Sequence, residues 1–194
     1  MKLPTRSLPF VLLALLLVGC ATAPPPEPET PAEPDPSAEL YRIAIDSARG
    51  GDAEAAAEQF EMLLEMKPDY PRAQTNLGLQ LMRLERFDEA RAALKRAIEQ
   101  DKNDAVAYNH LGVLARRDGQ FEQALDYYNQ AIEADPDYAS AHLNRGILLD
   151  LYMRDWPAAL EEYQRYQSLL DTPDPQVEKW IIDIRRRIEG AQKQ

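Results

Sequence analysis

The sequence is poor in the residues that catalytic and metal sites most often use. Among its 194 residues there are only one cysteine, two histidines and eight glycines. A single cysteine excludes an intrachain disulfide and a cluster of cysteine metal ligands. The glycines form no phosphate-binding loop. We therefore expect no enzyme, no metal site and no cofactor.

Basic residues are also scarce relative to acidic ones. The chain has 22 Lys and Arg against 33 Asp and Glu, giving a formal net charge of −11. Proteins that bind nucleic acid without regard to sequence need a basic surface to neutralise phosphates. The charge balance therefore argues against a nucleic-acid partner.

Residues 1–19 have the pattern of an export signal. Lys2 and Arg6 precede the apolar run Leu8–Val18, which is 11 residues long. Because a membrane-spanning helix needs about 20 residues, this run predicts a removable signal rather than a stable span.

The run ends in Leu17-Val18-Gly19-Cys20, which resembles the lipobox of bacterial lipoproteins. The resemblance implies cleavage before Cys20 and a diacylglycerol on its sulfur, so that acyl chains (diacylglycerol, palmitate) anchor the protein in a membrane. With Ala21 rather than aspartate after Cys20, the sequence resembles lipoproteins that enteric bacteria sort to the outer membrane. The alternative is an ordinary secretory signal in which the cysteine stays unmodified.

Residues 20–36 combine the lipidated cysteine with an acidic, proline-rich tether. From Ala21 to Pro36 the sequence holds prolines and acids but no basic or large apolar residue. Proline interrupts helices and sheets, and no apolar side chain offsets the entropy of ordering. We expect an extended spacer between membrane and domain.

Residues 37–173 consist of one unit repeated with a period of about 34 residues. The units are 37–70, 71–104, 105–138 and 139–173, the last with one extra residue. Small residues recur at the eighth position (Ala44, Gly78, Gly112, Gly146) and the twentieth (Ala56, Ala90, Ala124, Ala159), and large apolar residues follow four positions after the latter (Phe60, Leu94, Tyr128, Tyr163). This pattern resembles the tetratricopeptide repeat (TPR), a helix–turn–helix unit. Small residues let the paired helices approach, and stacking buries the large ones.

Residues 174–194 hold the last expected helix and the tail. Val177, Trp180, Ile181, Ile184 and Ile188 recur at spacings of three and four, which places them on one helical face. We expect a capping helix over the fourth unit; the alternative is a partner-binding or membrane-surface helix. The fold prediction is therefore all-α: a right-handed TPR superhelix of four repeats plus a C-terminal capping helix.

The resemblance also implies where a ligand binds, because first helices of TPR units line the inner surface of the array. Transferring the family's groove positions to each unit gives a candidate peptide-binding groove rich in arginine: Arg42, Arg49, Arg72, Asn76, Arg83, Asn109, His110, Arg116, Arg117 and Asn144. Guanidinium groups suit carboxylates. We expect a protein or peptide ligand that carries acidic or C-terminal carboxylate groups.

These predictions combine into a non-catalytic scaffold on the periplasmic face of the outer membrane. The architecture is similar to that of pilotin lipoproteins, tight-adherence pilus lipoproteins and adaptors of peptidoglycan hydrolases, which implies a role in envelope complexes for pili, secretion or cell-wall enzymes. The alternative function is a general periplasmic holding chaperone. The exposed ends of the array leave homodimerisation open.

Overall fold

The computed structural model describes residues 35–191, and every regular element in that range is helical. The helices are α1 (Pro36–Gly50), α2 (Ala53–Met66), α3 (Ala73–Arg83), α4 (Phe87–Gln100), α5 (Ala105–Arg117), α6 (Phe121–Ala134), α7 (Ala139–Leu148), the π-helical turn η1 (Leu149–Met153), α8 (Trp156–Ser168) and α9 (Pro175–Ala191). The predicted all-α fold class is confirmed. The export signal, Cys20 and most of the tether lie outside the described residues.

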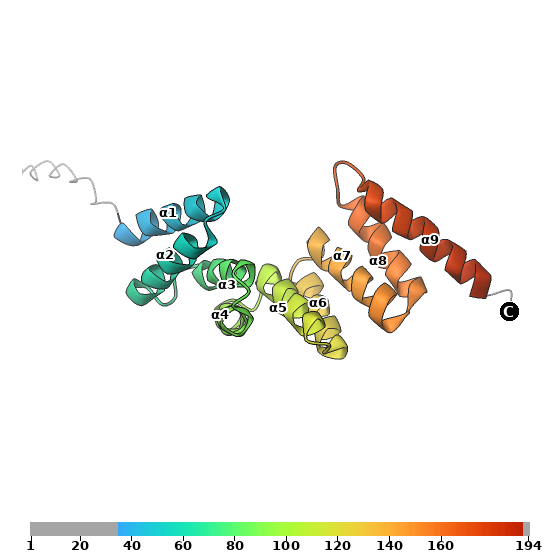
Figure 1. The fold of residues 1–194 in the computed structure, drawn as a ribbon, viewed down its shortest axis with the longest axis horizontal. Helices are drawn as coiled ribbons and strands as arrows, with labels where there is room; N and C mark the ends of the chain where they lie inside the picture. Colours follow the sequence, from blue (N-terminus) through green and yellow to red (C-terminus); the bar gives the residue numbers. More distant parts are fainter. Residues whose placement is uncertain (1–34, 192–194) are drawn as a thin grey trace, which may run out of the picture. The chain divides into compact units, whose positions relative to one another are not determined.

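The helices form hairpins that stack in chain order (Figure 1). Each odd-numbered helix from α1 to α7 packs against the next even-numbered helix, and each hairpin then contacts the following one. The first helices of neighbouring hairpins also meet, since α3 contacts α5 and α5 contacts α7. None of the described helices is both long enough and apolar enough to cross a membrane.

Aspartates begin several of these helices. The side chains of Asp52, Asp104 and Asp155 each accept a hydrogen bond from a backbone amide in the first turn that follows. A carboxylate at this position satisfies an otherwise unpaired amide and complements the helix dipole. Asp35 does the same for α1, and Pro36 occupies its first turn, so these two residues of the expected tether belong to the first helix.

At the eighth-position glycines, the second helix of the hairpin lies against the backbone of the first. A Cβ atom on Gly112 would lie 2.5 Å from Cε1 of Tyr128, and one on Gly146 would lie 2.7 Å from Cε1 of Tyr163. The same holds for Gly78 against Leu94. Only a residue without a Cβ permits this approach, which is why we call these three residues the notch glycines.

The core is the sum of these close contacts. The twentieth-position alanines are fully buried, as are the aromatic and aliphatic side chains that fill the space beside them (Ala56, Ala90, Ala124, Ala159, Phe60, Leu94, Tyr128). No hairpin buries this surface alone, so stacking supplies the stability.

Helix α9 covers the open side of the fourth hairpin. Val177 and Ile184 are buried against α8, and the Trp180 ring lies 5.5 Å from that of Tyr163. The predicted apolar face therefore caps the array.

The extra residue of the fourth unit is accommodated inside a helix. Where α5 simply ends at Arg117, α7 continues into the wider turn η1 and stops at Arg154, whose φ is 58°. The wider turn takes up the extra residue at the end of the helix.

Candidate functional site

Two hollows lie along the first helices, one after the other. The first, of about 400 Å³, is lined by Leu79, Gln80, Met82 and Arg83 of α3 and His110 of α5. The second, of about 480 Å³, is lined by Val113, Arg116 and Arg117 of α5, Gly119, Phe121 of α6, Ile147 of α7 and Tyr152 of η1. We call this pair of hollows the groove. It combines apolar side chains with arginines.

The first hollow places a cation beside a neutral imidazole. Nη1 of Arg83 donates to the carbonyl of Ala48 and to Oε1 of Gln80, which anchors the side chain between α1 and α3. Burial lowers the pKa of His110, although the nearby Asp104 carboxylate opposes the shift. Its Nδ1 is buried without a hydrogen-bond partner among the described residues. The histidine is therefore neutral near pH 7 and still has a hydrogen-bonding position to fill.

The second hollow is aromatic as well as basic. The Phe121 and Tyr152 rings lie 4.7 Å apart, and the Arg117 guanidinium lies 3.6 Å above the ring of Phe87. Arg117 also pairs with Asp118 at 2.9 Å. Arg116 is half-buried and forms no ion pair with the described residues. Guanidinium groups in a hollow that also contains aromatic rings suit a peptide that carries carboxylates.

The asparagines of the predicted groove connect the first helices to one another. Nδ2 of Asn76 donates to the hydroxyl of Tyr41 at 3.0 Å, and Nδ2 of Asn144 donates to Oδ1 of Asn109 at 2.9 Å. Asn109 is only 1% exposed. These side chains join successive hairpins, and Asn109 has no surface to offer a ligand.

Three predicted arginines lie apart from the groove. Arg42 pairs with Glu39 and Asp46 on its own helix, and these carboxylates raise its pKa. Arg49 lies exposed in the last turn of α1. Arg72 precedes α3 with a φ of 63° and borders a separate hollow among aspartates. The structure thus brings together only Arg83, His110, Arg116 and Arg117 out of the predicted set.

The site also contains residues that the sequence reasoning did not select. Gln80, Phe121 and Tyr152 line the hollows. Tyr152 reaches the second hollow because it lies in η1, and the one-residue insertion in the fourth unit was the only sequence signal for it. Within residues 35–191, no three His, Cys, Asp or Glu side chains gather as they would around a metal ion.

Comparison with known proteins identifies tetratricopeptide repeats in this chain. Two family models, each described as "Tetratricopeptide repeat", match residues 69–137 and 109–176. No curated protein matches the sequence.

Several solved structures are similar to this one. PilF of Pseudomonas aeruginosa has a TM-score of 0.70 at 18% identity over 79% of this chain and 69% of its own. A MamA fragment from Desulfovibrio magneticus RS-1 has a TM-score of 0.67 at 19% identity, covering 82% of this chain and 89% of its own. A thermophilic TPR protein from Thermus thermophilus has a TM-score of 0.64 at 22% identity, covering 78% of this chain and 82% of its own. At these identities the likeness shows the fold.

Proposed function

Because the chain is a tetratricopeptide-repeat protein, we propose that it is a non-catalytic scaffold that binds a partner protein or peptide in the groove. The observation that carries this proposal is the succession of two hollows on consecutive first helices, each with an arginine beside apolar side chains. An extended or helical segment follows such a surface by placing a side chain in each hollow.

The chemistry of the groove favours a ligand with carboxylate groups. Arg83 and Arg116 provide positive charge in successive hollows of a chain whose formal net charge is −11. Guanidinium groups bind carboxylates through two parallel hydrogen bonds. We therefore propose a ligand segment with acidic side chains or a C-terminal carboxylate.

We further propose that the scaffold is anchored by lipid on Cys20 at the periplasmic face of the outer membrane, where it supports assembly of pilus, secretion or cell-wall complexes. The lipobox-like sequence that ends in Cys20 supports the anchor. Labelling with radioactive palmitate and membrane fractionation test it, because Cys20→Ser should lose both the label and the membrane association. A C20S protein that still carries the label would contradict the anchor.

Charge reversal in the groove tests the ligand. A fluorescein-labelled peptide of alternating leucine and glutamate with a free C-terminal carboxylate should bind the wild-type chain. The double variant Arg83→Glu with Arg116→Glu should weaken that binding at least tenfold. The control is Arg42→Glu with Arg49→Glu, which makes the same charge change away from the groove. Equal losses for both pairs would reject the groove and indicate only a long-range charge effect.

A further inference from the structure

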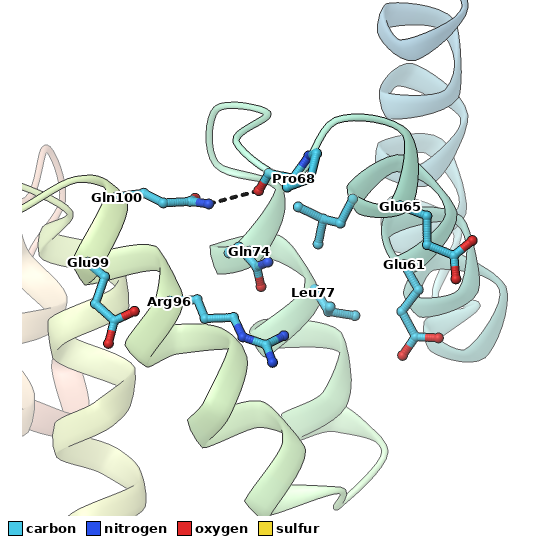
Figure 2. A pocket seen from close by; sticks show the side chains of 9 residues that line it. Glu61, Glu65, Pro68, Gln74, Leu77, Arg96, Glu99 and Gln100 are labelled. Atoms are coloured by element: carbon cyan, nitrogen blue, oxygen red, sulfur yellow. Dashed lines mark hydrogen bonds between the residues drawn. The ribbon is translucent and has the colours of Figure 1, made fainter.

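A further hollow lies away from the groove. It has a volume of about 600 Å³ and is formed by α2, α3 and α4 together with the turn before α3 (Figure 2). Its lining consists of Glu61, Leu64, Glu65, Pro68, Gln74, Leu77, Arg96, Glu99 and Gln100. We call it the α2–α4 pocket. Neither hollow of the groove shares a residue with it.

Gln74 lies at the centre of this pocket with an unused hydrogen-bond acceptor. The residue is only 6% exposed, and its Oε1 has no hydrogen-bond partner among the described residues. Figure 2 shows the Gln74 side chain among the residues that line the pocket. An unpaired buried amide oxygen destabilises the fold unless a donor reaches it, so this position favours a ligand with an N–H group.

The charged residues around the pocket are incompletely paired. Glu65 and Glu99 form no ion pair with the described residues, whereas Glu61 lies 3.8 Å from Arg86. Arg96 likewise forms no ion pair in residues 35–191. Three carboxylates thus surround the pocket against one guanidinium that belongs to it. The pocket therefore attracts a cation, and its single arginine can donate to a carbonyl.

Apart from Gln100, whose Nε2 donates to the carbonyl of Pro68 at 2.8 Å, the remaining lining is apolar and suits an aliphatic stem. Leu77 is buried, and Leu64 and Pro68 lie beside it in the pocket. On the same helix as Glu61 and Glu65, Met62 and Met66 are 55% and 54% exposed. Flexible methionines are common on surfaces that bind varied apolar side chains.

From these features we propose that the α2–α4 pocket binds a lysine- or arginine-bearing segment of a partner protein. The aliphatic stem lies on Leu64 and Leu77, and the charged end pairs with Glu65 and Glu99. An N–H group donates to Oε1 of Gln74, and a backbone carbonyl of the segment accepts from Arg96. The protein then has two binding surfaces of opposite preference: the groove for acidic segments and this pocket for basic ones.

Matched peptides test the proposal. The full chain is titrated, with fluorescence anisotropy as the readout, against the fluorescein-labelled, amidated peptide GLRLRG and its acidic counterpart GLELEG. The basic peptide should bind saturably to the pocket. The double variant Glu65→Gln with Glu99→Gln should weaken its binding on the order of tenfold, because both carboxylates are exposed and each pair contributes modestly. Gln74→Leu should weaken it about three- to tenfold through loss of the acceptor.

The controls separate this pocket from the groove. Arg83→Glu with Arg116→Glu should leave the affinity for GLRLRG unchanged even if that variant no longer binds the acidic peptide, so the two proposals fail independently. Thermal unfolding followed by circular dichroism checks that Gln74→Leu is folded, and the glutamate variants do not depend on that result. The proposal is overturned if GLRLRG does not saturate, if GLELEG competes with it equally, or if neither set of pocket variants changes its affinity.

Discussion

The third and fourth hairpins pack in the same way, but the fourth is one residue longer. In both, a notch glycine receives the edge of a tyrosine ring: Gly112 that of Tyr128 and Gly146 that of Tyr163. The third hairpin then turns at Gly119, with a φ of 75°, whereas the fourth inserts η1 before it turns. The notch contact keeps its register because the extra residue follows the glycine.

The insertion changes the surroundings of the tyrosine hydroxyl. Burial raises the pKa of Tyr128 to about 12, and its hydroxyl has no hydrogen-bond partner in the described chain. Burial also raises the pKa of Tyr163, and the negative charge of Asp150 in η1 raises it further. Asp150 is 8% exposed and lies 3.4 Å from Arg187 of α9. Asp150 thus connects the fourth hairpin to the cap through Arg187, whereas the third hairpin has Arg116 at the same position of its unit.

The largest loss of stability should come from disrupting the contact between notch glycine and tyrosine that the two hairpins share. Gly112→Ala and Gly146→Ala each place a Cβ against a ring, and each should lower the free energy of unfolding by about 1–3 kcal/mol in urea titrations. Gly50→Ala is the control, because nothing lies within 4 Å of its added Cβ. If Gly112→Ala unfolds at the same urea concentration as the wild type, the notch does not limit helix approach.

A smaller, pH-dependent effect should be confined to the fourth hairpin. Arg187→Ala leaves the Asp150 carboxylate buried without its counter-charge. The cost at pH 7 should be about 1–2 kcal/mol, because Arg187 itself is half-exposed.

The sign of the pH dependence follows from the direction of the shift. Burial raises the pKa of Asp150 above its ordinary 3.8, and Arg187 opposes this. Between 3.8 and the raised folded-state pKa, the folded protein binds more protons than the unfolded chain, so stability falls as pH rises. Arg187→Ala raises that pKa further. The loss of unfolding free energy caused by Arg187→Ala should therefore shrink as the pH is lowered towards 4. When Asp150→Asn is added to the same chain, this loss should no longer depend on pH. A deficit that does not change with pH would contradict the assignment.

The smallest effect should separate the two tyrosines. Tyr163→Phe removes a hydroxyl that lies near the Asp150 carboxylate and should cost about 1 kcal/mol. Tyr128→Phe removes a buried hydroxyl without a described partner and should be neutral or slightly stabilising. Urea unfolding of the two variants side by side measures the difference directly. Equal costs would show that the hydroxyl contacts do not distinguish the hairpins.

Sequence reasoning succeeded where the chain repeats itself. The notch glycines and the buried alanines recur at fixed positions of the unit, and the resemblance of that pattern to the tetratricopeptide repeat predicted the stacked hairpins. The spacing of three and four residues predicted the apolar face of α9. It was less informative for the groove. Family positions describe an average first helix, whereas Arg42 pairs with acids that are specific to α1, and Asn109 is buried by a bond to the next hairpin. The position of Tyr152 depends on the path of η1. The insertion indicated a change at this point of the sequence but not the path that the backbone takes.

The bonds between neighbouring first helices have a consequence for transplanting parts of this chain. Tyr41 with Asn76, and Asn109 with Asn144, are pairs in which each partner belongs to a different hairpin. Hydrophobic burial is non-directional and tolerates rotation of one hairpin against the next, whereas a hydrogen bond between short side chains does not. The smallest exchangeable module is therefore not a single hairpin but two consecutive ones. A chimaera joined between Asn109 and Asn144 would keep an apolar core but lose the hydrogen bond that fixes the angle between the third and fourth hairpins.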